Sequence, residues 1–207
     1  MKARTFVIGT LVATLSAPAI AAQLSPAMET VVAIHQSEFR GYKPGNKELR
    51  GRLSELGKVA TPDEIEQIIT GAKADWLVVD IRNDTQHNGG HILVDGKPML
   101  HVGREKPTTE LQAKAMEIAN GKEILRAAPS NIVIMCRSGM KSAFDYASYA
   151  AAGFQDVKIA GILDWVKACK PLASASKIED AGLAKKKIVM TPHDDGLYYW
   201  EECRTAQ

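Results

Sequence analysis

The 207-residue sequence lacks several features that mark specialised classes of protein. No internal repeat with a period of about 20–50 residues is visible, nor is a long low-complexity tract, which argues against repeat architectures. The charges are almost balanced, at 26 basic and 24 acidic residues, and no basic stripe is present, so nothing indicates a nucleic-acid partner. Beyond the N-terminal segment, no apolar run is long enough to cross a membrane. Instead, 45% hydrophobic and 24% charged residues are typical of a globular protein.

The N-terminal segment has the three parts of a secretory signal peptide. Lys2 and Arg4 form a basic start, "FVIGTLVATL" is an apolar middle, and Ala19 and Ala21 fit an A-x-A cleavage pattern. A buried helix or an uncleaved anchor is the alternative, but the apolar run is short for a bilayer. We therefore expect residues 1–22 to be removed. This loss of two basic residues leaves 24 basic against 24 acidic residues, in a periplasmic or secreted protein without stable membrane insertion.

Cysteine is scarce, and the absence of a Cys-x-x-Cys pair disfavours thiol–disulfide exchange as the function. The three cysteines are Cys136, Cys169 and Cys203. An odd number in an exported protein suggests one free thiol beside a disulfide. The pair that we would choose is Cys169 with Cys203, which leaves Cys136 free. Three reduced cysteines are the alternative, because a sequence does not supply disulfide geometry; Cys169 could then act as a resolving thiol if the fold brought it close.

Short apolar runs alternate with helical segments along the chain. Three runs rich in β-branched residues predict strands buried on both faces, at 76–81, 132–136 and 157–160. Helices are expected at 25–39, from Thr61 (a capping box with Glu64, and Pro62 at the first helical position), at 108–128, at 141–154 and from 161. This alternation predicts an α/β fold with a parallel sheet flanked by helices on both faces.

We divide the chain into four parts: a signal peptide (1–22), an N-terminal extension (23–59), one domain (60–170) and a C-terminal extension (171–207). Within the domain, the Asp95–Gly96 turn signal predicts a small hairpin or an irregular loop. In the C-terminal extension we expect the lysine run Lys185–Lys187 to be exposed. We expect residues 193–195 to form a polar turn before an aromatic strand at 198–200, rather than a metal site. No metal or other cofactor is expected.

The stretch "IVIMCRSGMKSAF" places Cys136 at the end of a buried strand, before a Gly-containing polar loop and a helix. Gly139 permits backbone conformations that other residues resist, so the loop can turn several N–H groups inward. The next helix adds its positive N-terminal end, and Arg137 and Lys141 add formal charge. Together these groups would stabilise a thiolate, the nucleophilic form, or a persulfide. An inert cysteine that ends a core strand is the alternative.

Three stretches together resemble rhodanese-type sulfurtransferases: "VVDIRNDTQHNGGHI", "CRSGMKSAF" and "AAGFQDVKIAGILDWVKA". The resemblance implies a persulfide on Cys136, with sulfur arriving from a small anion such as thiosulfate. The sulfur would leave to a thiol or a cyanide-like acceptor, or to a protein acceptor, in a second covalent step. The alternative is a non-enzymatic rhodanese-like module that binds a partner protein in periplasmic sulfur or redox metabolism.

The resemblance also implies a role for each matching residue. Cys136 is the sulfur carrier, and its substrate cradle consists of Arg137, Ser138, Gly139, Met140 and Lys141. Three further residues match the family at a strand end and at its Gly-His-Ile motif, and we expect them to brace the loop and neighbouring backbone: Asp80, Arg82 and His91.

The sequence departs from the family pattern at three places. Lys141 stands where many members carry arginine, Ile162 where a second glycine is frequent, and the Asp95–Gly96 turn replaces a shorter connection. Phosphatases of the Cys-x5-Arg type need arginine at position 142, where this chain has Ser142. This difference argues against a phosphatase.

Overall fold

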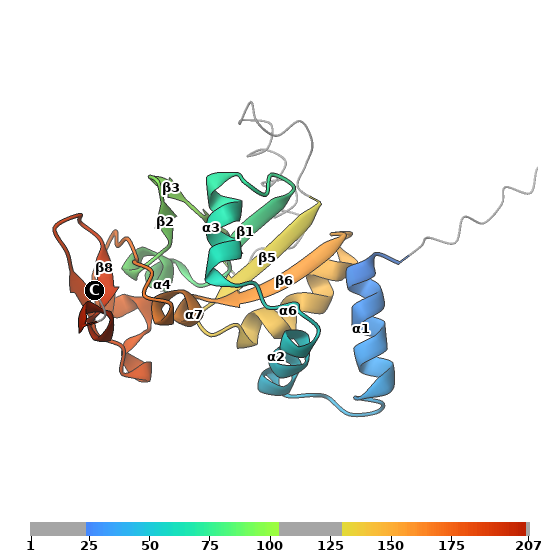
Figure 1. Cartoon of the computed structure of the whole chain (residues 1–207). Helices are drawn as coiled ribbons and strands as arrows, with labels where there is room; N and C mark the ends of the chain where they lie inside the picture. Colours follow the sequence, from blue (N-terminus) through green and yellow to red (C-terminus); the bar gives the residue numbers. More distant parts are fainter. Residues whose placement is uncertain (1–23, 104–129, 206–207) are drawn as a thin grey trace, which may run out of the picture.

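A computed structural model of the chain describes residues 24–103 and 130–205 (Figure 1). The predicted signal peptide and the predicted helix at 108–128 lie outside the described residues. In the described part, no helix combines the length and apolar character needed to cross a membrane.

A four-stranded parallel sheet forms the centre of the molecule, in the order β4-β1-β5-β6. The strands are β1 (Trp76–Asp80), β4 (Leu100–His101), β5 (Asn131–Cys136) and β6 (Asp156–Gly161). The three predicted strands are therefore confirmed, and all three pair in parallel. The short strand β4 was not predicted, since two residues carry no periodic pattern.

Helices cover both faces of this sheet, as predicted. On β5, Val133 and Met135 belong to one core cluster, while Ile132 and Ile134 belong to the other, because successive side chains point to opposite faces. One face is covered by α3 (Pro62–Thr70) and α7 (Ile162–Lys167), and the other by α1 (Pro26–Ser37), α2 (Asn46–Glu55) and α6 (Met140–Ala151) (Figure 1).

Local sequence signals account for several helix ends. The Thr61 hydroxyl accepts a hydrogen bond from the Glu64 amide, and the Glu64 carboxylate accepts one from the Thr61 amide, which is the predicted capping box of α3. Gly71, with a positive φ, ends that helix. The helix α6 ends as expected just before Gly153, which also has a positive φ.

Both segments outside the predicted domain join its core. From the N-terminal side, Leu53 of α2 is buried in the cluster beneath α6. From the C-terminal side, Leu172 and Leu183 are buried in the cluster on the opposite face. The boundaries at 60 and 170 stay predictions, but the flanking segments pack as parts of one globule.

Short elements complete the fold: α4 (Asp84–Gly89), β2 (Leu93–Val94), β3 (Lys97–Pro98), η1 (Ile178–Ala181), η2 (Ala184–Lys186), β7 (Met190–Pro192), β8 (Tyr198–Trp200) and η3 (Glu201–Thr205). The predicted hairpin is β2–β3, in which Asp95 and Gly96 both have positive φ, as a type I′ turn requires. The lysine run at η2 is exposed, and the polar turn precedes the aromatic strand β8, as expected.

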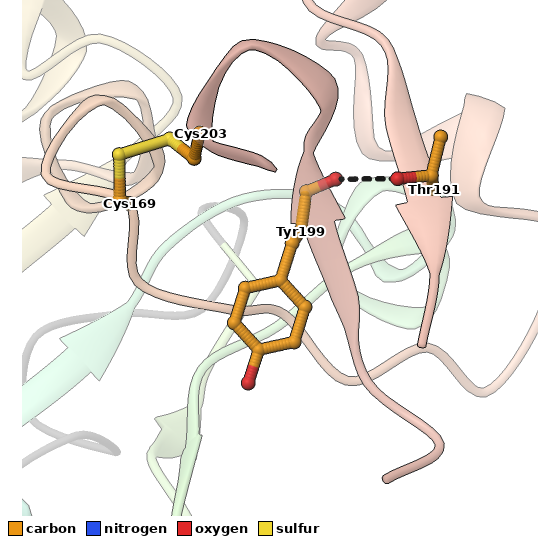
Figure 2. The surroundings of a disulfide bond; sticks show 4 residues. All are labelled: Cys169, Thr191, Tyr199 and Cys203. Atoms are coloured by element: carbon orange, nitrogen blue, oxygen red, sulfur yellow. Dashed lines mark hydrogen bonds between the residues drawn. A yellow bond between two sulfur atoms is a disulfide. The ribbon is translucent and has the colours of Figure 1, made fainter. Parts of the chain in front are cut away.

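A disulfide pins the C-terminal segment to the end of α7. Cys169 and Cys203 are bonded, with their Cα atoms 5.5 Å apart, which confirms the predicted pairing (Figure 2). In the same region the Thr191 hydroxyl donates a hydrogen bond to the Tyr199 carbonyl. Cys136 is free, and because Cys169 is bonded to Cys203, Cys169 is not a resolving thiol for it.

Candidate functional site at the end of β5

Cys136 is the last residue of β5 and is only 4% exposed. After a short turn, α6 begins at Met140. Gly139, at φ +75°, occupies the N-cap position of this helix, in the left-handed conformation that favours glycine. The sequence had predicted this arrangement of strand, glycine-containing loop and helix.

The N-terminus of α6 has no side-chain cap. A helix leaves its first amides without intrahelical acceptors, and a side chain at the N-cap usually satisfies one of them. Gly139 has no side chain, and no side-chain cap is present at this helix. The first amides of α6, which no side chain caps, point towards the region where an anion beside the cysteine loop would bind.

The cationic residues of the loop add to this potential. Arg137 is half-buried and Lys141 is exposed. Within the described residues, neither side chain forms an ion pair with a carboxylate. Their charge is therefore available to an anionic ligand.

The back of the loop packs closely on the start of α7. A Cβ atom at Gly161 would lie 2.8 Å from the Ser138 carbonyl carbon and 3.0 Å from the Gly139 nitrogen, so a side chain there would displace the loop. The Leu163 amide donates a 3.0 Å hydrogen bond to the Arg137 carbonyl. The end of β6 thus fixes the course of the loop.

Two segments distant in sequence also touch the loop, and sequence reasoning missed both. Arg50 of α2 lies against Gly139, and Gly182, which follows η1, lies against Arg137. Neither residue stands in a local motif, so only the tertiary structure reveals them.

Asp80 and Arg82 form a buried ion pair at the end of β1. Arg82 Nη2 donates to Asp80 Oδ2 at 2.7 Å, Nε donates to the same carboxylate, and both residues are at most 3% exposed. Arg82 also donates to the carbonyls of Gln86, within α4, and of Gly90, the residue that follows α4. Within the described chain, its side-chain hydrogen bonds reach no residue of the cysteine loop. The pair therefore braces neighbouring backbone, and Asp80 lies beside Met135, the residue before Cys136, in the β1–β5 pairing.

The environment of Asp80 keeps its carboxyl ionised. Burial alone would raise the pKa, but the hydrogen bond from His87 and the charge and hydrogen bonds of Arg82 outweigh burial and lower the pKa from 3.8 to about 2. His87 Nδ1 lies 2.8 Å from Asp80 Oδ2. The sequence predicted a bracing role for Asp80 but did not single out His87 as its partner.

His91 belongs to a stack of three imidazole rings. Its ring stacks on that of His87, with centroids 4.9 Å apart, and His87 stacks on His101 at 4.0 Å. Burial, followed by the neighbouring His87, lowers the pKa of His91. Among the described residues, no group of three His, Cys, Asp or Glu side chains is arranged to hold a metal ion.

Ser142 lies in the first turn of α6 and is fully buried. Its hydroxyl has no hydrogen-bond partner within the described part of the chain. The position that carries the phosphate-clamping arginine in Cys-x5-Arg phosphatases is thus occupied by a small, enclosed side chain.

The fold and this strand end define a class of protein: an α/β domain with a free cysteine at the carboxyl end of a central parallel strand, ahead of an uncapped helix. Residues 61–168 match the rhodanese-like domain family. This match covers more than half of the chain, and the protein belongs to that family.

Other comparisons add little to this assignment. No curated protein matches the sequence. Among solved structures, the BH2092 protein from Bacillus halodurans is 18% identical, with a TM-score of 0.40 over 63% of this chain and 86% of its own. A protein of unknown function from Rhodopseudomonas palustris, titled a possible tyrosine phosphatase, is 16% identical, with a TM-score of 0.40 over 61% of this chain and 92% of its own.

Proposed function

We propose that this protein is a sulfurtransferase that carries sulfane sulfur as a persulfide on Cys136. The observation that supports the proposal is the combination of a free cysteine, a helix N-terminus without a side-chain cap, and two cationic side chains that form no ion pair within residues 24–103 and 130–205. Reactive cysteines favour such electropositive surroundings. Sulfur transfer through a cysteine persulfide is also the activity that membership of the rhodanese-like family suggests first.

The proposed reaction has two displacements and needs no external oxidant. With thiosulfate as donor, the Cys136 thiolate attacks the sulfane sulfur, the sulfur–sulfur bond of thiosulfate breaks, and sulfite leaves with the electron pair. The persulfide keeps one negative charge, which the α6 N-terminus, Arg137 and Lys141 would stabilise. A thiolate or cyanide acceptor then attacks the outer sulfur atom, and the Cys136 thiolate is regenerated.

Mass spectrometry of the intact protein tests this proposal. The mature chain should gain one sulfur atom on incubation with thiosulfate and lose it again on addition of cyanide or a thiol. Cys136→Ala should gain none. If the parent protein gained no sulfur from thiosulfate or from other persulfide donors, the enzyme proposal would be wrong.

A second candidate is a non-enzymatic module that binds a partner protein, and the low exposure of Cys136, 4%, favours it. Under this alternative, partner binding would survive Cys136→Ala and no sulfur would be loaded. A protein acceptor for the sulfur would combine the two candidates, since it must dock beside the loop.

We also propose export to a periplasmic or extracellular space. The N-terminal sequence pattern and the Cys169–Cys203 disulfide support it, because structural disulfides persist mainly in oxidising compartments. Fractionation of cells that produce the full chain, followed by N-terminal sequencing, tests both export and cleavage after residue 22.

A further inference from the structure

Arg50 lies against the cysteine loop, although it comes from α2, outside the residues that match the family. A Cβ atom on Gly139 would lie only 2.7 Å from Arg50 Nε and 3.3 Å from Arg50 Cδ. The arginine side chain therefore occupies the space that any larger residue at position 139 would need. Arg50 thus contacts Gly139, which has the left-handed conformation in the loop and is the N-cap of α6.

A partner from the other side of the loop holds Arg50 in place. Arg50 Nη2 donates a 2.9 Å hydrogen bond to Asp164 Oδ2, in the first turn of α7. The same Asp164 oxygen would lie 2.9 Å from a Cβ atom on Gly161, the glycine that supports the back of the loop. The ion pair thus bridges α2 and α7 across the loop.

The ion pair is poorly placed to stabilise the fold by its charge alone. The side chains of Arg50 and Asp164 are 32% and 37% exposed, and pairs of such exposure contribute little to stability. Arg50 Nε is nevertheless buried, and it has no hydrogen-bond partner within the described residues. A buried donor without a partner costs free energy, and Arg52 Nε in the same helix carries the same cost. What distinguishes Arg50 is its contact with Gly139 of the cysteine loop.

We propose that Arg50, held by Asp164, is a positioning residue that fixes the cysteine loop for sulfur transfer. This inference rests on the proposed function and adds α2 to the transfer apparatus. Arg50 Nε and Cδ fill the space beside Gly139. They thereby prevent the loop and the first turn of α6 from moving towards α2. The donors of the α6 N-terminus then stay aimed at the loop in the absence of substrate.

Arg52 provides a matched control two residues further along the same helix. Its side chain is 31% exposed and pairs with Glu38 and Glu55, neither of which belongs to the loop. Among the described residues its buried Nε, like that of Arg50, has no hydrogen-bond partner. Arg50→Ala and Arg52→Ala thus remove the same charge from α2 and break comparable surface pairs. Only Arg50→Ala removes the contact with Gly139.

The first measurement is alkylation of Cys136 by iodoacetamide as a function of pH. It needs no sulfur donor, and the other two cysteines are bonded to each other, so it reports this thiol alone. Arg50→Ala should slow alkylation at neutral pH and move its rise to higher pH, because the loop donors are less well placed, whereas Arg52→Ala should leave both unchanged. Thermal unfolding of both variants checks that each is folded at the assay temperature.

The second measurement is the kinetics of sulfur transfer from thiosulfate. Arg50→Ala should lower kcat by on the order of 10-fold, because small displacements of reacting groups are costly, with a smaller change in KM. Arg50→Lys keeps the charge and a partner for Asp164 but lacks the planar fork, so it should recover only part of the rate.

The outcomes separate the two proposals. If the parent chain loads no sulfur but Arg50→Ala still alters alkylation, the proposed function fails and the positioning role stands. The positioning role is overturned if Arg50→Ala behaves like Arg52→Ala in alkylation, if its loss of rate only follows a loss of folded protein, or if Arg50→Lys restores the full rate.

Discussion

The strands β1 and β5 lie side by side and end at the same edge of the sheet, yet their ends are built in opposite ways. At the end of β1, the charge of Asp80 is matched by Arg82 and by a hydrogen bond from His87. The helix that follows, α4, is capped by Asn83, whose side chain accepts from the Gln86 amide at 2.9 Å. Polar groups at this strand end satisfy one another.

At the end of β5, the charged side chains and the helix start have few partners within the described part of the chain. Arg137 and Lys141 form no ion pair within the described residues, and α6 starts at Gly139 without a side-chain cap. The comparison shows how one sheet edge divides structural from functional roles. A polar cluster that satisfies itself stabilises the fold, whereas one with spare donors and charge can bind a ligand.

Cys136→Ala gives the largest contrast between the two strand ends. Loss of the nucleophile should reduce sulfur transfer by about 1,000-fold or more. Stability should fall by only about 1 kcal/mol, because the change removes one small buried atom group and no ion pair. The measurements are the steady-state rate and urea unfolding of the same preparation. Transfer at a rate near that of the parent would locate the chemistry elsewhere in the chain.

Arg82→Ala should have the opposite effects, a large loss of stability and little change at the cysteine loop. It leaves the Asp80 carboxylate buried without its main partner, and breaking a buried pair in this way costs about 3–5 kcal/mol. Urea unfolding measures the loss. In the fraction that remains folded, the rate of Cys136 alkylation should change little, since Arg82 bonds to α4 and not to the cysteine loop. A stability loss below about 1 kcal/mol would contradict a structural role for the pair.

The lowered pKa of Asp80 predicts a defined loss of stability in acid. Because the folded-state pKa of about 2 lies below the ordinary 3.8, the ionised carboxyl stabilises the fold fully above pH 3.8. This contribution, about 2 kcal/mol, is lost as the pH falls from 3.8 towards 2. Urea unfolding of Asp80→Asn should show a pH dependence smaller by that amount. His87→Gln, the milder change, should remove part of it, and an unchanged pH dependence in both variants would refute the assignment.

Sequence reasoning succeeded where the signals were local. The β-branched runs gave the three longer strands, the capping box at Thr61 gave the start of α3, and Asp95–Gly96 gave the hairpin. The Cys136 loop was found in the same way, since strand, glycine and helix follow one another within a few residues. Each of these features depends on neighbours in the sequence.

What the sequence could not supply depends on contacts between distant residues. The helix α2 was missed because its segment is rich in charge and glycine, and its buried Leu53 gains a partner only when α2 packs under α6. Arg50 and Asp164 are 114 residues apart, so no motif joins them. The Cys169–Cys203 pairing was favoured, but it needed the geometry of η3 to be established.

Asn83→Ala is the smallest change that tests the comparison. It removes the side-chain cap of α4 and should cost about 1 kcal/mol of stability, because the Gln86 amide loses its acceptor. Sulfur transfer should stay within about twofold of the parent rate, since Asn83 lies at the β1 end, where the polar groups bond to one another.

Gly139→Ala is the matching change at the start of α6. It introduces a Cβ at a positive φ and against Arg50, so it should impair transfer even where its cost in stability is similar. If Asn83→Ala and Gly139→Ala changed the transfer rate equally, the proposal that the β1 end is structural and the β5 end functional would be wrong.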